Sequence, residues 1–147
     1  KMKLIFATLF LLVQSLAFSA GSSSSIDANK EYLKAEKLIK SYEFEKAIKA
    51  LNKLLTETPD GYTKADLYNY LGYATRKQQK PNFEKAEKYY LKALKINDQH
   101  IGALEYLGEL YYETDRLEEA FELLDRLESA AGKDSEEYLE LFEILNS

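Results

Sequence analysis

Apolar residues recur at spacings of three and four from Ile26 to the end of the chain. This spacing collects apolar side chains on one face of an α-helix. The same stretch contains no Val and no alternating run of β-branched residues, so local propensity also favours helices. The pattern predicts an all-α domain of seven helices, near residues 27–40, 44–57, 64–78, 83–96, 100–113, 116–131 and 135–146.

Residues that can cap a helix N-terminus stand before each predicted helix. They are Asp27, Ser41, Thr63, Asn82, Asp98, Asp115 and Asp134. Two of them are followed three residues later by an acidic residue, Asp66 after Thr63 and Glu118 after Asp115. This is the spacing of a capping box, in which two side chains satisfy free backbone N–H groups at the helix start. The helix starts are therefore predicted from local chemistry.

Three segments superimpose without gaps, which indicates an internal repeat. They are FEKAIKALNKLL (44–55), FEKAEKYYLKAL (83–94) and LEEAFELLDRLE (117–128). Each begins with a large apolar residue, and Phe44, Phe83 and Leu117 are expected to fill the space between successive helical hairpins. Small residues recur in register where two helices are expected to cross closely. They are Ala35, Gly72 and Gly108 on the first helices and Ala47, Ala86 and Ala120 on the second ones.

The third copy carries Leu107, Gly108 and Tyr111 ahead of Ala120, which follows Ala86 by 34 residues. This arrangement resembles the tetratricopeptide repeat, a helix–turn–helix unit. The resemblance covers residues 28 to about 131. It implies an α-solenoid over residues 27–147, with repeats at about 28–61, 65–100 and 101–134 and a capping helix at about 135–146.

A closer likeness lies in the stretch from His100 to Tyr111 and in Glu136-Glu137-Tyr138. These segments resemble small exported bacterial tetratricopeptide repeat proteins. Many members of that group carry paired cysteines just before the Glu-Glu-Tyr. Ala131 and Ser135 stand at those approximate places and the sequence has no Cys, so no redox role is expected.

The first twenty residues have the order of a secretory signal peptide. Two lysines precede an apolar run from Leu4 to Phe18, and small residues follow. The run is shorter than the roughly 20 residues that a transmembrane helix needs. We therefore expect residues 1–20 to be removed by cleavage next to Ala20, with residues 21–26 as a Ser-rich spacer. The expected location is the periplasm; the alternatives are secretion, or membrane anchoring by an uncleaved leader.

The residue types exclude several kinds of chemistry. Without Cys, the sequence offers no disulfide, thiolate metal site or cysteine nucleophile. Its one His, His100, is expected to face a loop or to stand at a helix start, and no nucleophile in a sharp turn accompanies it. The sequence has no Gly-rich phosphate loop and no EF-hand spacing. No catalytic residue, metal or cofactor is expected.

The charge balance bears on the partner. After the first twenty residues the chain carries 18 basic and 25 acidic side chains, a net charge of −7. Nucleic-acid binding depends largely on Lys and Arg, so this balance argues against a nucleic-acid partner. Once the leader is cleaved, no stable membrane insertion is expected either. A protein or peptide partner remains.

In tetratricopeptide arrays the first helix of each hairpin lines the concave face. The resemblance therefore places a Tyr-rich, mildly acidic set of residues on that face. The candidate peptide-binding residues are Tyr32, Glu36, Asn69, Tyr70, Tyr73, Arg76, Glu105, Tyr106, Glu109 and Tyr112. Tyrosine gives a large contact area with few torsions to immobilise, which suits peptide recognition. The alternative is that these tyrosines only pack between neighbouring first helices.

Family members that bind a C-terminal carboxylate use Lys and Asn at fixed concave positions. The corresponding positions here are Tyr32, Glu36, Tyr70, Glu105 and Glu109, and the acids among them would repel such a ligand. We therefore expect an exported module that binds a neutral or basic protein segment and catalyses nothing. The alternative is a structural part of an envelope complex, or a self-associating scaffold, that acts through its convex face or end helix.

Overall fold

The computed structural model describes residues 25–147, and every helix or strand in this part of the chain is an α-helix. The helices are α1 (Ala28–Lys40), α2 (Phe44–Lys53), α3 (Lys64–Lys77), α4 (Phe83–Ile96), α5 (Ile101–Glu113), α6 (Leu117–Ala131) and α7 (Glu136–Leu145). The all-α prediction is confirmed, and within residues 25–147 each helix begins within one residue of its predicted start. The predicted signal peptide lies outside the described residues.

Side-chain caps start most of the helices. Asp27, Thr63 and Asn82 accept a hydrogen bond from the backbone of the helix that follows them, as predicted. Thr63 and Asp66 form the predicted capping box. Two other predicted caps, Asp98 and Asp134, are wrong: the residues that cap α5 and α7 are His100 and Ser135.

The tight turns inside the first and third hairpins also differ from the prediction. Ser41 ends α1, and Asp115 has a φ of 59°, so neither has the extended backbone of an N-cap. Tyr42 occupies the place equivalent to Asp115 and also has a φ of 59°. The left-handed residue reverses the chain between two antiparallel helices, and this requirement overrides the cap. Glu43 and Arg116 then precede α2 and α6 without a side-chain cap, and the capping box predicted at Asp115 does not form.

The small residues mark close helix crossings, as predicted. Ala35, Ala47, Ala86 and Ala120 are fully buried. A Cβ on Gly72 would lie 2.6 Å from the ring of Tyr90, and one on Gly108 would lie 2.6 Å from Leu141. The first of these contacts joins α3 to α4, and the second joins α5 to α7. Glycine is therefore needed at both positions for space.

The large residues that begin the second helix of each hairpin differ in how deeply they are buried. Phe44 is buried, and its ring lies 6.0 Å from that of Tyr73. Phe83 and Leu117 are 36% and 49% exposed, so the prediction that they fill the space between hairpins is wrong. The positions equivalent to Tyr73 in α5 and α7 are Glu109 and Glu143. A carboxylate gives much less apolar cover than a tyrosine ring, because it has far less apolar surface.

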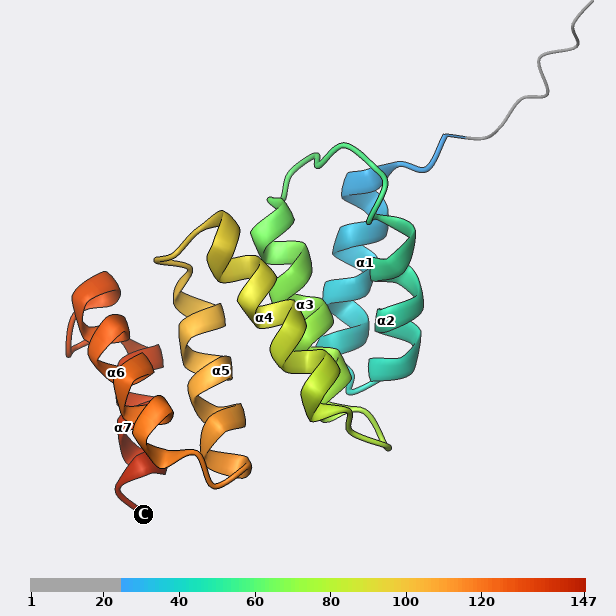
Figure 1. Ribbon diagram of the computed structural model, residues 1–147. Helices are drawn as coiled ribbons and strands as arrows, with labels where there is room; N and C mark the ends of the chain where they lie inside the picture. The colour runs from blue at the N-terminus through green and yellow to red at the C-terminus, as the bar shows by residue number, and fades with distance from the viewer. Residues whose placement is uncertain (1–24) are drawn as a thin grey trace, which may run out of the picture.

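The helices stack as three hairpins followed by α7. α1 packs on α2, α3 on α4 and α5 on α6, and each second helix also contacts the next first helix. α3 contacts α5 and α5 contacts α7, so the first helices form one side of the row. Figure 1 shows α1 and α7 at opposite ends of this row. Among residues 25–147 no helix is long and apolar enough to cross a membrane.

Gly72→Ala is expected to lower the free energy of unfolding by about 1–3 kcal/mol through overpacking, although Ala favours helix by about 1 kcal/mol. The new Cβ would strike the ring of Tyr90, which is fully buried and has no room to move. Urea denaturation followed by circular dichroism measures the change. Gly102→Ala is the matched control, because its Cβ first meets the flexible end of the Asn69 side chain. Equal stability of Gly72→Ala and wild type would contradict the crossing.

Candidate functional site

A cavity of about 350 Å³ opens on the side of the row formed by the first helices. Its lining residues are Glu36, Ile39, Lys40, Tyr42, Tyr70, Tyr73 and Tyr106. They come from α1 and the turn after it, from α3 and from α5. Stacking of the hairpins brings residues 34 positions apart, such as Glu36 and Tyr70, into contact. We call this hollow the inner cavity.

Aromatic rings in and beside the inner cavity form two contacting pairs. The Tyr73 and Tyr106 ring centroids are 4.7 Å apart, and those of Tyr32 and Tyr70 are 5.6 Å apart. Such tilted contacts stabilise aromatic pairs beyond their buried area. Tyr70, Tyr73 and Tyr106 are only half-buried, however, so each ring also presents surface to the cavity. Packing between first helices and exposure to a ligand therefore coexist in these residues.

A hydrogen bond fixes the acidic side of the cavity. The Tyr70 hydroxyl donates to Glu36 Oε1 at 3.0 Å. Burial, and after it the bond to Glu36, raise the pKa of Tyr70 to about 12. The hydroxyl therefore remains a donor at neutral pH and orients the Glu36 carboxylate at the rim.

Four of the ten predicted binding residues are buried. Tyr32, Asn69, Arg76 and Glu105 are at most 7% exposed, so they offer a peptide little side-chain surface. Tyr32, Asn69 and Glu105 are equivalent positions of successive first helices, on the side that the next hairpin covers. Of the other six, Glu36, Tyr70, Tyr73 and Tyr106 line the inner cavity. Tyr112 and Glu109 do not.

Arg76 is a buried link between the second and third hairpins. Its side chain has no exposed area, and its guanidinium donates to Glu113 Oε1 at 2.8 Å. A second ion pair joins it to Glu109. The rings of Tyr73 and Tyr106 lie 5.7 and 5.8 Å from its Cζ, within cation–π distance. Arg76 therefore packs against both tyrosine rings, and its buried, paired guanidinium is not available to an anionic ligand.

His100 caps the start of α5, and its side chain also contacts Asp66 of α3. Its Nδ1 accepts a hydrogen bond from the Ala103 N–H at 3.1 Å, and Nε2 lies 3.0 Å from Asp66 Oδ1. Burial opposes ionisation of Asp66, but hydrogen bonds from Thr63 and His100 outweigh it and lower the pKa of this carboxyl. Thr63 contacts the carboxylate and not the imidazole, so no nucleophile–base pair exists here. The residues form a structural link.

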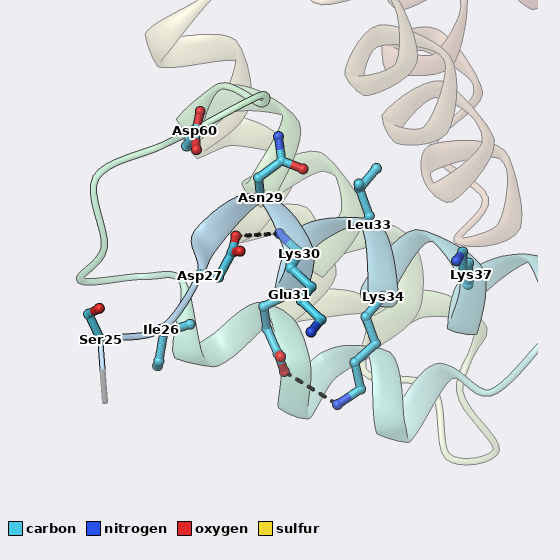
Figure 2. Close-up of a pocket in the computed structure, with 10 residues that line it drawn as sticks. All are labelled: Ser25, Ile26, Asp27, Asn29, Lys30, Glu31, Leu33, Lys34, Lys37 and Asp60. Atoms are coloured by element: carbon cyan, nitrogen blue, oxygen red, sulfur yellow. Dashed lines mark hydrogen bonds and ion pairs between the residues drawn. The ribbon is translucent and has the colours of Figure 1, made fainter. Parts of the chain in front are cut away.

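A larger hollow of about 890 Å³ lies along the outer side of α1, at the start of the row. Figure 2 shows its lining residues on α1 and the segment before it, with Asp60 from the loop after α2. Glu31 in this hollow pairs with Lys34 and with Lys53 of α2. None of the predicted binding residues lines it.

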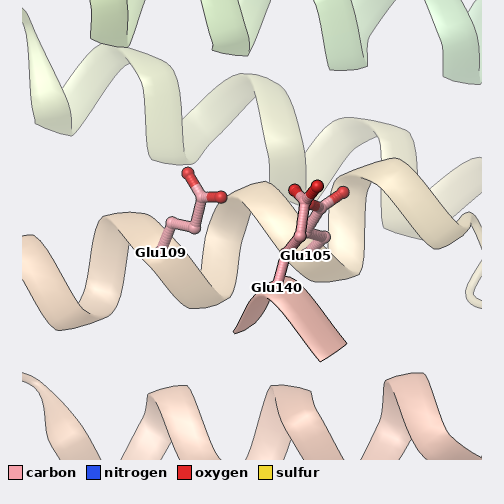
Figure 3. A group of neighbouring side chains, drawn as sticks. All are labelled: Glu105, Glu109 and Glu140. Carbon is pink, nitrogen blue, oxygen red and sulfur yellow. The ribbon is translucent and has the colours of Figure 1, made fainter. Parts of the chain in front are cut away.

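Glu105, Glu109 and Glu140 bring carboxylate oxygens within 4.8 Å of one another (Figure 3). This is the geometry that could hold a divalent cation. Glu109 already pairs with Arg76. Burial, followed by the Glu140 and Glu109 carboxylates, raises the pKa of Glu105 to about 9, so this carboxyl is protonated at neutral pH. A proton on Glu105 and the Arg76 guanidinium beside Glu109 therefore offset two of the three negative charges.

Sequence reasoning missed three residues of the inner cavity, Ile39, Lys40 and Tyr42. Ile39 and Lys40 end α1, and Tyr42 follows in the turn. Tyr42 is 79% exposed and has a left-handed backbone, which is rare for a bulky side chain. A tyrosine at the turn position that Asp115 takes in the third hairpin is the signal that could have revealed it.

Comparison with known proteins identifies the repeat. Residues 79–141 match the family model of the tetratricopeptide repeat. Among curated proteins, none matches the chain. The solved structure of the Hsp90 co-chaperone Cns1 from Saccharomyces cerevisiae is similar, with a TM-score of 0.70 and 18% identity over 81% of this chain. The match spans only 38% of that protein's chain.

Two single domains are similar over nearly their whole length. One is the first tetratricopeptide domain of Spaghetti (RPAP3) bound to the HSP90 peptide SRMEEVD, with a TM-score of 0.67, 23% identity and coverage of 81% of this chain and 90% of that one. The other is the second such domain of human RPAP3 with the HSP70 peptide SGPTIEEVD, with a TM-score of 0.66, 20% identity and coverage of 82% and 95%. At these identities the likeness shows a shared fold. The family match covers residues 79–141, and the described residues share the all-α solenoid fold of tetratricopeptide repeat domains.

Proposed function

We propose that this chain is an exported interaction module that binds a neutral or basic peptide segment at the inner cavity and catalyses no reaction. The observation that carries the proposal is the cavity itself, which is lined by four tyrosines from the turn after α1 and from α3 and α5. Tyrosine rings with accessible faces are a common means of peptide recognition. The signal-peptide pattern of residues 1–20 supports export.

The charges around the cavity favour a basic or neutral ligand. Arg76, the one cation among the predicted binding residues, is buried and paired. Glu36 and Lys40 both line the cavity, so the charges of its lining balance. A preference for a basic peptide would come from the α5 side, where Glu109 and Glu113 outnumber Arg76, and this attraction would weaken with salt.

The similar domains of RPAP3 bind peptides that end in acidic residues. An acidic peptide end would need basic side chains at certain concave positions. In this chain those positions hold acidic or aromatic residues, such as Glu36, Tyr70 and Glu109. We therefore propose the same general mode, a peptide along the first helices, with the opposite charge preference.

Tyr42→Asp is expected to weaken peptide binding at least about fivefold without loss of stability. The ring at the cavity rim is removed, while Asp tolerates the left-handed backbone better than Tyr, as Asp115 does in the third hairpin. The probe is a set of random dodecamer peptides selected by display on wild type, with affinities of the selected peptides measured by fluorescence anisotropy. We expect the selected peptides to carry no net negative charge.

Phe121→Asp is the matched control, since it removes an exposed aromatic side chain from α6, away from the cavity. It is expected to leave peptide affinity unchanged. SRMEEVD serves as an acidic probe and is expected to bind poorly. Selection of acidic peptides, or equal binding by wild type and a folded Tyr42→Asp variant, would rule out the inner cavity as this site.

A further inference from the structure

The two ends of the row carry opposite charge. Residues 25–96 hold 15 basic and 10 acidic side chains, a net +5, whereas residues 97–147 hold 3 basic and 15 acidic side chains, a net −12. In Figure 1 these two parts of the chain lie at opposite ends of the row. Such a separation gives the molecule a strong field along the row and steers encounters between opposite ends.

Lys30, Leu33 and Lys37 form a stripe on the outer side of α1, which we call the head stripe (Figure 2). Leu33 is 50% exposed. The equivalent residues of α3 and α5 pack against the preceding hairpin; they are Leu67, Tyr70, Ala74, Ala103, Tyr106 and Leu110. The head stripe is thus the surface with which each later hairpin joins the one before it, and no hairpin of residues 25–147 packs on it.

Glu136, Leu139 and Glu143 form a matching stripe on α7, which we call the tail stripe. Leu139 is 51% exposed, and Phe142 beside it is 45% exposed. The equivalents of Leu139 in the earlier first helices are Tyr32, Asn69 and Glu105, all buried where the next hairpin covers them. The tail stripe is therefore the opposite side of the same junction, and within residues 25–147 no further hairpin packs on it.

We propose that the tail stripe of one molecule binds the head stripe of a second copy of this chain. Both stripes have the same spacing, three residues and then four. In the register of the internal junction, where Tyr70 lies on Tyr32, Leu33 lies on Leu139. Each lysine of the head stripe then lies next to a glutamate of the tail stripe. Within residues 25–147 none of these four charged side chains forms an ion pair.

The charges select this pairing over symmetric ones. A head-to-head dimer would bring lysines together, and a tail-to-tail dimer would bring glutamates together, and like charges repel. A head-to-tail contact leaves one free head and one free tail on every pair, so further copies can add and the size of the assembly depends on concentration. The inner cavity lies on the side of the row and not at its ends, so every molecule in such an assembly keeps its own peptide site.

Sedimentation velocity and light scattering of the full chain test the proposal. Wild type is expected to show a weight-average mass that rises with concentration and falls when salt is raised. Leu33→Ser and Leu139→Ser each damage every junction and are expected to weaken association at least about tenfold. An equimolar mixture of the two variants retains one intact junction per pair and is expected to form heterodimers and nothing longer. Leu91→Ser, at a 47% exposed position of α4, is the control that leaves assembly unchanged.

Three results would overturn the proposal. A wild-type mass that stays monomeric up to about 0.5 mM would show that no such contact forms with useful affinity. Normal association by Leu33→Ser together with loss in Leu139→Ser would show a symmetric tail-to-tail dimer. If neither substitution weakens association, then residues outside the two stripes, such as those of the leader, form the contact between copies.

Discussion

Arg76→Ala is expected to lower the free energy of unfolding by about 3–5 kcal/mol, the usual loss when one partner of a buried ion pair is removed. Two effects act together. The substitution leaves a cavity beneath the rings of Tyr73 and Tyr106. It also leaves Glu109 and Glu113 without their shared cation, in a region already dense in carboxylates. Urea denaturation at pH 7 measures the loss.

Two further substitutions separate these effects. Arg76→Met fills most of the space and removes only the charge, so the difference between Met and Ala reports the cavity. Lys77→Ala removes the next cation along α3, which is exposed, and is expected to change stability by less than about 0.5 kcal/mol. If Arg76→Ala costs no more than Lys77→Ala, then Arg76 does not link the second and third hairpins.

The free energy of unfolding is also expected to fall as the pH rises between about 5 and 8, with a contribution of up to about 1.4 kcal/mol per pH unit from Glu105. Burial and the neighbouring Glu140 and Glu109 raise the pKa of Glu105 from 4.5 to about 9. In this range the folded chain keeps a proton that the unfolded chain releases. The stabilisation is therefore complete below the unfolded pKa and is lost as the pH rises through the folded pKa.

Glu105→Gln keeps the size of the side chain and cannot ionise, so it is expected to raise the free energy of unfolding at about pH 8 by about 2 kcal/mol or more. It should also flatten the pH dependence. Glu122→Gln, an exposed position of α6, is the charge-matched control. Parallel pH curves for wild type and Glu105→Gln would contradict the buried proton. A melting temperature raised by Ca²⁺ in wild type and not in Glu105→Gln would assign the three glutamates to a cation.

Sequence reasoning about the site did not predict the contacts between polar residues that are far apart in the chain. Arg76, Asn69 and Glu105 are polar residues on amphipathic helices, and locally such residues indicate solvent. They are buried because helices that follow about 34 residues later cover them, and Arg76 finds its two acids on α5. A single chain without an alignment carries no signal for such a contact, because the partners are far apart in sequence and each is common on exposed surfaces.

Tyr42 illustrates the same limit in a turn. Its neighbours Ser41 and Glu43 suggest a helix start, and capping chemistry is local. The conformation of the turn is set instead by the distance and direction between α1 and α2, which places Tyr42 in the left-handed region and its ring at the cavity rim. The strain at a bulky residue is tolerated because the packed hairpin fixes it.

By itself the sequence determined the helices, their order and their repeat. Periodic apolar residues set the helices, and small residues such as Gly72 and Ala86 set the crossings, because helix formation and steric exclusion act over a few residues. Only the tertiary structure decided which polar residues are covered, which aromatic rings border the inner cavity, and that no hairpin of residues 25–147 packs on the head and tail stripes. Those outcomes depend on what the next hairpin places against each helix, and at the two ends of the described row there is no next hairpin.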